Sequence, residues 1–251
     1  MGQLLTAPVM AVKMGNARLI PGLAVRLSRI VEQGRQPQHH VRPHSSHRTG
    51  CMISDDEACC EASKNEIVRR YYAATNKMAR GACNDNEIAK IQLLFNQAKI
   101  TTDFRRTTVA AKNFKKETGH TSAAIELEDG TIITAKSSEL LGCSAALLLN
   151  VMKHLAGIDH DLKLIPQSMI EPIQHTKISY LGGRNPRLHT DEVLVALSVL
   201  SVDDDNCRRA LEQLPKLRGC QAHCTVMLSD VDQKIFKKLG VNLTCEPVLK
   251  K

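Results

Sequence analysis

The spacing of apolar and polar positions predicts two helices within residues 54–99. Residues 54–57 read Ser-Asp-Asp-Glu, a capping box in which the serine and the glutamate bond to unpaired backbone N–H groups at a helix start. An apolar stripe follows at helical spacing, and residues 84–87 repeat the cap before a second stripe. The stripes consist of Cys60, Ile67, Tyr71, Ala74 and Met78, and of Ile88, Ile91, Phe95 and Ala98. The pattern predicts a helical hairpin.

The periodicity then shortens to that of strands. Residues 123–127 and 131–135 flank the sequence Glu-Asp-Gly, in which Asp-Gly supplies the backbone angles of a tight hairpin turn. Residues 138–156 are apolar nearly all round, so the helix that they predict must be buried on most sides. We therefore expect a two-stranded hairpin followed by a buried helix.

The rest of the chain alternates between strand and helix patterns. We expect a strand at 176–181 and a helix that opens at Asn185, with Pro186 in its first turn. Further elements are predicted at 204–214 (helix), 222–228 (strand), 229–240 (helix) and 241–245 (strand). Alternation of this kind indicates a layered domain, so the predicted fold class is α/β with an N-terminal helical hairpin. The expected boundaries are 53–100 for the hairpin and 101–251 for the α/β part.

The first fifty residues differ from the remainder. Residues 33–50 carry too few aliphatic side chains to offset the entropy cost of ordering. Residues 4–31 have a composition that also suits a mitochondrial transit peptide, and residues 1–6 fit the myristoylation pattern. We prefer to interpret residues 1–52 as a disordered or spurious leader.

Charge and cysteine content exclude several classes of protein. The net charge is +8, but residues 1–50 hold seven basic side chains and one acid, so the remainder is close to neutral. We therefore expect no nucleic-acid partner, since such binding requires clustered Lys and Arg. No apolar run reaches the ~20 residues that span a bilayer, so no membrane partner is expected. The nine cysteines in a chain of this length indicate reduced thiols and a cytoplasmic location.

Three stretches carry a family signature. They are residues 53–72 (ISDDEACCEASKNEIVRRYY), 123–142 (AAIELEDGTIITAKSSELLG) and 181–197 (LGGRNPRLHTDEVLVAL). The chain resembles the domain of unknown function 1846 family, also called uncharacterised protein family 0371, in its C-terminal portion only. The resemblance implies a layered α/β domain of cytidine-deaminase-like topology. It also implies that a Gly-rich, phosphate-cradling N-terminal half is missing, and hence a truncated protein of unknown function, inactive as a fragment and prone to self-association.

A zinc site is not predicted, and we expect no cofactor. A zinc deaminase needs an H-x-E and a P-C-x-x-C to hold the metal and move protons. Cys220, His223 and Cys224 have a different spacing and no preceding proline. Alternation along a strand would also place the last two on opposite faces.

The best candidate for binding is an anion site at two predicted helix starts. Glycines, arginines and unpaired helix N–H groups together favour phosphate or carboxylate, and His189 with Asp191 would then transfer protons. The candidate ligand-binding residues are Lys136, Ser137, Ser138, Gly182, Gly183, Arg184, Asn185, Arg187 and His189.

A purely structural interpretation remains open. The glycines would allow a tight turn, the arginines would pair with acids, and Asp191 and Glu192 would offset the helix dipole. The alternatives for function are therefore a domain that binds an anionic small molecule, which would make it a candidate enzyme, and an interaction module that works through the helical hairpin. The catalytic residues of such an enzyme are unknown.

Overall fold

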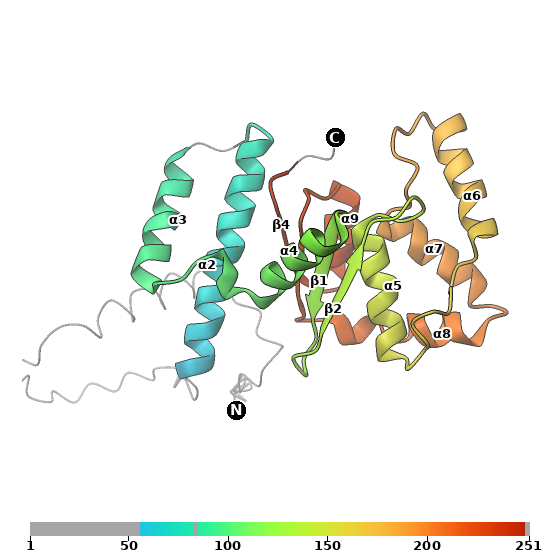
Figure 1. Ribbon diagram of the computed structural model, residues 1–251, viewed down its shortest axis with the longest axis horizontal. Coiled ribbons are helices and arrows are strands. Elements are labelled where there is room, and N and C mark those ends of the chain that lie inside the picture. Colours follow the sequence, from blue (N-terminus) through green and yellow to red (C-terminus); the bar gives the residue numbers. More distant parts are fainter. Residues whose placement is uncertain (1–55, 83–84, 249–251) are drawn as a thin grey trace, which may run out of the picture. The chain divides into compact units, whose positions relative to one another are not determined.

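A computed structural model describes residues 56–82 and 85–248 (Figure 1). The expectation for residues 1–52 therefore lies outside the described residues. The chain divides into two compact units, Met1–Glu66 and Ile67–Lys251. The described part of the first unit is helical, and all interactions analysed below lie within the second unit.

The two helices predicted near the start are confirmed. They are α2 (Asp56–Ala79) and α3 (Asp85–Ala98). The rings of Tyr71 and Phe95 lie 5.2 Å apart, which packs the second half of α2 against α3. The residues that α2 buries are small or partly polar, and they include Val68 and Tyr72.

A short 3₁₀ helix, η1 (Thr102–Phe104), and helix α4 (Arg106–Thr118) follow, and neither was predicted. Helix α4 buries Thr107, Thr108 and Ala111, which are too small or too polar to form a visible apolar stripe. It ends at Gly119, whose φ of 70° is the left-handed conformation that glycine adopts without strain.

Four strands form one sheet in the order β2-β1-β3-β4. Strands β1 (Ser122–Glu126) and β2 (Ile132–Lys136) form the predicted hairpin, and β3 (Gln221–Cys224) and β4 (Asn242–Cys245) match the two later strand predictions. Strand β1 is antiparallel to β2 and β3, whereas β3 and β4 are parallel. The described chain is thus an α/β fold with a mixed sheet.

The strand predicted at 176–181 is wrong. Helix α6 (Gln167–His175) runs directly into a π-helical turn, η2 (Thr176–Tyr180). Pro172 inside α6 argues against a helix from sequence, because proline removes a backbone donor. The alternation over 176–181 reflects this turn and not a pleated strand.

The later helices are α7 (Thr190–Leu200), α8 (Asp205–Leu211) and α9 (Asp230–Lys238), with a 3₁₀ turn, η3 (Leu214–Leu217). Helix α7 begins at Thr190 and not at the predicted Asn185. Likewise, the buried helix α5 (Cys143–Leu155) begins five residues after the predicted start. In both cases the residues before the helix form a loop whose backbone pairs with another segment.

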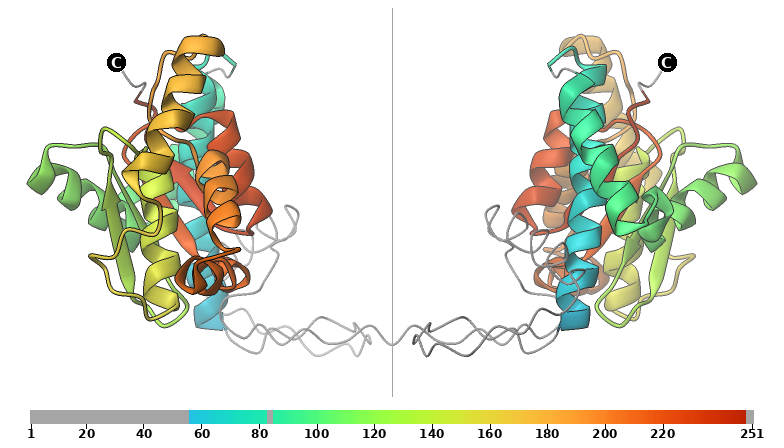
Figure 2. Two further views of the ribbon diagram at one scale, coloured as in Figure 1. Left: turned by 90° about the vertical axis from the view of Figure 1, so that its right-hand side faces the viewer. Right: turned by 90° about the vertical axis from the view of Figure 1, so that its left-hand side faces the viewer.

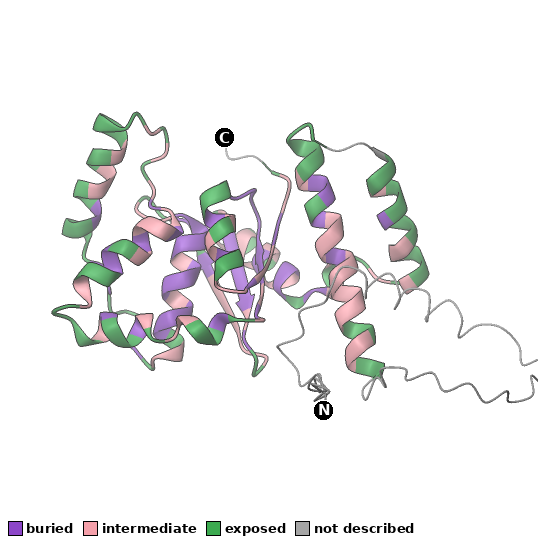
Figure 3. Ribbon diagram, turned by 180° about the vertical axis from the view of Figure 1, so that it is seen from behind, coloured by how far each residue is buried: buried purple, intermediate pink, exposed green. Residues whose placement is uncertain are grey.

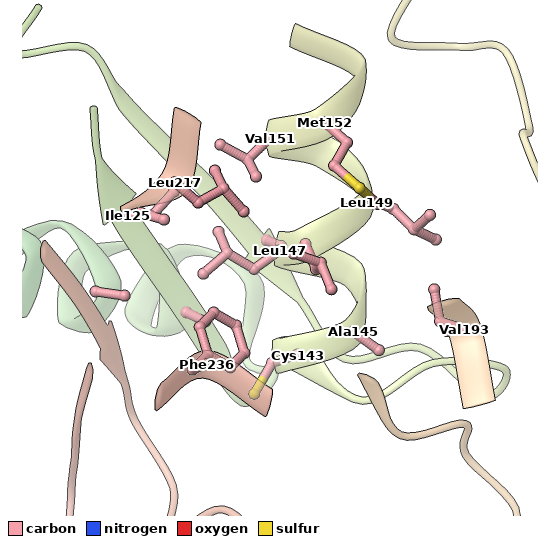
Figure 4. Packing of buried hydrophobic residues seen from close by; sticks show 14 of the residues in the cluster. Ile125, Cys143, Ala145, Leu147, Leu149, Val151, Met152, Val193, Leu217 and Phe236 are labelled. Carbon is pink, nitrogen blue, oxygen red and sulfur yellow. The ribbon is translucent and has the colours of Figure 1, made fainter. Parts of the chain in front are cut away.

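The two faces of the sheet differ in chemistry. Helices α4 and α5 lie on opposite faces (Figure 2). Beneath α5, side chains such as Ile125, Ala222 and Cys224 join the apolar core. Around them α5 contributes Leu147 and α9 contributes Phe236 (Figure 4). The face beneath α4 carries polar residues instead.

Burial is concentrated in the sheet and α5, whereas α3 and α6 are mostly exposed (Figure 3). Among residues 56–82 and 85–248, no helix combines the length and apolar character required to cross a bilayer.

Two leucine substitutions test this assignment of the core. Leu147 is completely buried in the core beneath the sheet, and Leu93 on α3 is 62% exposed. Leu147→Ala is expected to lower the free energy of unfolding by about 2–5 kcal/mol, because it removes buried apolar surface and leaves a cavity. Leu93→Ala, the matched control, should change it by about 0.5 kcal/mol or less. Urea denaturation measures both, and equal effects would contradict the assignment.

Candidate functional site

The structure brings together the two segments that precede helices α5 and α7. Leu141 and Leu188 form an isolated parallel β-bridge. The N–H of Leu188 donates to the oxygen of Leu140 at 2.9 Å, and the N–H of Gly142 donates to the oxygen of Leu188 at 3.2 Å. Arg187 Nε donates to the backbone carbonyl oxygen of Ser138 at 2.5 Å. The starts of the two helices therefore adjoin.

Lys136 and Ser137 have a different setting. Lys136 is the last residue of β2, and Ser137 follows it. The Ser137 N–H donates to the backbone oxygen of Thr121 at 2.8 Å, and its hydroxyl accepts from Thr121 Oγ1 at 2.7 Å. Lys136 is exposed. Within the described ranges, no hydrogen bond or ion pair links either residue to the 182–189 loop.

The two glycines of the 182–189 loop have a structural role. Gly182 has a φ of +65°, and the Gly183 N–H donates to the Lys177 oxygen at 2.9 Å. A Cβ on Gly183 would lie 2.8 Å from that same oxygen, closer than side-chain atoms approach. This contact anchors the loop to the π-helical turn. The tight-turn role that the structural interpretation assigns to these glycines is therefore present.

The polar residues of the loop divide into bonded and unbonded groups. Asn185 Oδ1 accepts from the Arg187 N–H at 3.2 Å, which fixes the turn. Arg184 is exposed, and its side chain makes no hydrogen bond or ion pair within the described part of the chain. Of the predicted binding residues, Arg184 and Lys136 are therefore exposed cations without a hydrogen bond or ion pair of the side chain in the described residues.

His189, at the N-terminal boundary of α7, is held by a buried carboxylate. Its Nδ1 lies 2.9 Å from Asp232 Oδ2 on α9, and its side chain is 24% exposed. Asp232 Oδ1 accepts from both the N–H and the hydroxyl of Thr190 at 2.9 Å, and Oδ2 accepts from Ser229 Oγ at 2.7 Å. Asp232 thus joins the first turns of α7 and α9.

These bonds control the ionisation of Asp232. Burial by itself would raise the pKa of this carboxyl group, but the donors on His189, Thr190 and Ser229 outweigh it and hold the pKa well below its usual range. Asp232 therefore carries its charge at neutral pH. A charged acceptor at Nδ1 fixes that nitrogen as the N–H donor and leaves Nε2 as the basic atom of the neutral ring.

The arrangement suits proton transfer but not nucleophilic catalysis by serine. His189 Nε2 makes no hydrogen bond within the described residues, so it can accept a proton from a ligand and return it afterwards. Ser229 Oγ lies 3.5 Å from Nδ1, the nitrogen already engaged by Asp232. A triad would require the hydroxyl at Nε2.

Acidic side chains occupy donors at the start of α7. Glu192 Oε2 accepts from the His189 N–H at 2.7 Å and from Lys177 Nζ at 2.8 Å, while Asp232 takes the Thr190 N–H. Asp191, predicted to share in proton transfer, has Oδ1 buried without a described hydrogen-bond partner. An anion at this place would consequently depend on arginine and His189 more than on backbone N–H groups.

Sequence reasoning missed Asp232 and Lys177. Residues 229–232 indicated only a helix cap, and that role is real, since Ser229 Oγ accepts from the Asp232 N–H at 3.2 Å. The same carboxylate reaches a histidine 43 residues away, and no local pattern contains that contact. Lys177 lay in the segment that was mistaken for a strand.

The three residues considered for zinc do not converge. His223 packs its ring 4.9 Å from that of Tyr72, whereas Cys224 faces Cys143 and Cys245 on the other side of the sheet. Hydrogen bonds with these two thiols, followed by burial, raise the pKa of Cys224 well above its usual value. A neutral thiol is a poor metal ligand. No group of three or more His, Cys, Asp or Glu side chains is placed to hold a metal within the described residues.

The role of Asp232 has a measurable consequence for stability. Asp232→Asn should lower the free energy of unfolding at pH 7 by about 1.5–3 kcal/mol, because hydrogen bonds to a charged group are lost. Since folding depresses the pKa, this stabilisation is complete above the unfolded value of about 3.9 and is lost progressively as the pH falls from there through the depressed folded value. Urea denaturation at pH 7 and pH 3 should show the gap between wild type and variant narrowing in acid. The exposed Asp203, substituted as Asp203→Asn, serves as control, and a gap as wide at pH 3 as at pH 7 would count against this role.

Comparisons with known proteins identify the family. Two family models match, described as domain of unknown function DUF1846, N-terminal, over residues 25–99, and DUF1846, C-terminal, over residues 103–251. The expectation that only the C-terminal portion of the family is present is therefore wrong. The first match includes residues 25–52, assigned above to a leader, and their structure lies outside the described residues.

The chain is similar to curated proteins called UPF0371. It is 48% identical to one from Corynebacterium urealyticum over 85% of this chain and 43% of the relative. The identity is 42% to one from Streptococcus thermophilus, over 92% and 47%, and 43% to one from Corynebacterium diphtheriae, over 94% and 47%. The chain thus spans less than half the length of these relatives. With both family models matched, it belongs to the DUF1846 (UPF0371) family.

Proposed function

We propose that the segments 136–142 and 182–189 bind a phosphorylated or otherwise anionic small molecule, and that His189 exchanges a proton with it. The observation that carries this proposal is the pairing of His189 with Asp232. A buried carboxylate orients the imidazole through Nδ1 at 2.9 Å, while Nε2 has no described hydrogen-bond partner on a partly exposed ring. Carboxyl groups whose pKa is shifted by specific partners, as that of Asp232 is, are enriched at functional sites.

The cations beside His189 supply the attraction. Arg184 is exposed and unpaired within the described residues, and Arg187 uses only Nε in its bond to Ser138. Its terminal nitrogens make no hydrogen bond within the described residues, and guanidinium groups favour the planar, two-pronged contact that phosphate and carboxylate offer. The anion would therefore lie on the arginine side of the loop.

The nearby acids do not cancel this attraction. The charge of Glu192 is matched by Lys177 at 2.8 Å, and that of Asp232 is satisfied by its hydrogen-bond donors. Asp191 remains the carboxylate closest in sequence to His189 without an ion pair in the described chain. An anionic ligand bound through Arg184 would best avoid the Asp191 carboxylate by approaching along the exposed edge of the loop.

We further propose a cytidine-deaminase-like topology and a cytoplasmic location. The hairpin β1–β2 followed by the buried helix α5 supports the first. Cysteines that form no disulfide, such as Cys207, Cys220 and Cys245, support the second, because a reducing compartment keeps thiols in this state. Topology alone assigns no activity.

A second proposal is an interaction module that works through α2 and α3. Leu93 and Met78 are 62% and 42% exposed, and such side chains favour a protein partner over solvent when they gather on one surface. Pull-down experiments with and without residues 54–99 test it, and a partner retained by the shortened chain would contradict it.

Ligand-dependent stabilisation tests the first proposal. A thermal shift screen with sugar phosphates and nucleotides should find a compound that raises the Tm, because a ligand at 100 times its Kd stabilises by about 2.7 kcal/mol. Arg184→Ala and Arg187→Ala should each remove the shift. Arg208→Ala on α8, which loses only an exposed pair with Asp205, is the matched control. A shift that survives both loop substitutions would refute the site.

Calorimetry tests the role of His189. Titration of the stabilising compound in two buffers of different ionisation enthalpy measures the protons taken up or released on binding. Wild type should show such proton exchange. His189→Asn should bind without it, because the asparagine amide can still donate to Asp232 but cannot titrate. Equal proton exchange in both proteins would exclude His189 as the proton-transfer group.

A further inference from the structure

One exposed aromatic side chain lies just before the 182–189 loop. The aromatic residues of the chain are three Tyr and four Phe, and all of them lie within the described residues. Only Tyr180 among them is exposed, at 75%, whereas the others are buried or half-buried. Leu181, the next residue, is 77% exposed. A tyrosine ring has a large apolar surface, and here that surface and an adjacent leucine face solvent.

The backbone places these two side chains at the tip of a closed turn. The Gly183 N–H donates to the Lys177 oxygen at 2.9 Å, which closes the base of the turn formed by residues 178–182. The chain enters this turn from the π-helical segment and leaves it directly into the loop. Tyr180 and Leu181 therefore project from a backbone whose two ends are bonded to each other.

Lys177 joins this turn to the arginines of the loop. Its backbone oxygen closes the turn, while its Nζ donates to the Arg187 oxygen at 2.9 Å. Because an extended chain spans at most about 3.6 Å per residue, the Cα atoms of Leu181 and Arg184 lie within about 11 Å of each other. The apolar tip and the cations are thus close enough for one small molecule to contact both.

The charge of this segment favours an anion. The sequence between Glu171 and Asp191 contains no acidic residue, and it contains three basic residues of permanent charge. One of them, Lys177, is engaged by Glu192 at 2.8 Å. The other two are Arg184 and Arg187, whose terminal nitrogens make no hydrogen bond within the described residues. The exposed ring and these guanidinium groups therefore occur together in a segment without a competing carboxylate.

The ring of Tyr180 keeps an open face. Its centroid lies 5.4 Å from that of the His175 ring, with the two planes at 79°, which is an edge-to-face contact. A planar ring that has this neighbour and is still 75% exposed leaves one face to solvent. Its hydroxyl group makes no hydrogen bond within the described residues. Nucleotide bases stack on open aromatic faces of this kind.

We propose that the anionic ligand of the 182–189 loop is a nucleotide, whose base stacks on Tyr180 and contacts Leu181 while its phosphate binds Arg184 and Arg187. The inference rests on the proposed function, because it uses the same anion site. A sugar phosphate supplies the anion, but its hydroxyl groups would leave the apolar tip uncovered. A nucleotide joins the phosphate to a planar base and so matches both parts of this surface. Tyr180 is then the residue that selects among phosphorylated compounds.

Isothermal titration of the full chain at constant ionic strength tests the proposal with adenosine 5′-monophosphate and ribose 5-phosphate, which differ by the base. Wild type should bind the nucleotide about tenfold more tightly, since stacking on an aromatic ring contributes about that factor or more. Tyr180→Ala should remove this preference without weakening ribose 5-phosphate, and Tyr180→Phe should keep it. Val202→Ala, which shortens another apolar side chain that is 79% exposed, is the matched control and should behave as wild type.

The outcomes separate this inference from the function on which it rests. Binding of neither compound by wild type would refute the anion site, and the nucleotide with it. Equal binding of both compounds, or a preference that survives in Tyr180→Ala, would overturn the nucleotide while the anion site stands. Adenosine, which lacks the phosphate, should bind more weakly than its monophosphate. Equal affinity for these two would place the base away from the arginines and would also overturn the proposal.

Discussion

The carboxylate of Asp232 connects the parts of the fold that surround the proposed site. Asp232 lies in the first turn of α9, a helix that Ser229 caps. Its two carboxylate oxygens contact Thr190 and His189 at the start of α7. Two helix N-termini therefore share one buried negative charge, which is the charge that both helix dipoles favour. The orientation of His189 follows from this shared charge.

Arg105 lies on the opposite face of the sheet and is a buried charge that is less completely hydrogen-bonded. Both residues are buried and charged, and both join elements distant in sequence. The donors around Asp232 satisfy it, whereas Arg105 Nη1 has no hydrogen-bond partner within the described residues. Because burial of a charge is costly, burial lowers the pKa of Arg105, whereas hydrogen-bond donors outweigh burial at Asp232 and keep its pKa low.

The sequence predicted the elements that have a clear local signature. Helices α2 and α3 and the β1–β2 hairpin were predicted because their apolar positions follow a period of 3.6 or 2, α5 because it is apolar nearly all round, and α9 from its cap at residues 229–232. Helix α4 was missed because Thr107, Thr108 and Ala111 form its buried side, and the π-helical turn at Thr176–Tyr180 was mistaken for a strand. The loop with Gly182 to His189 was singled out correctly as unusual, since glycines followed by arginine and proline break every regular pattern.

The sequence by itself determined the fold class and the burial of helix α5. These properties depend on neighbours in the chain, and local spacing records them. Only the tertiary structure decided which groups are paired: that Asp232 holds His189, that Lys177 neutralises Glu192, and that Arg105 Nη1 has no hydrogen-bond partner within the described residues. Charge pairing depends on distance in space and on burial, and the sequence contains neither until the chain has folded.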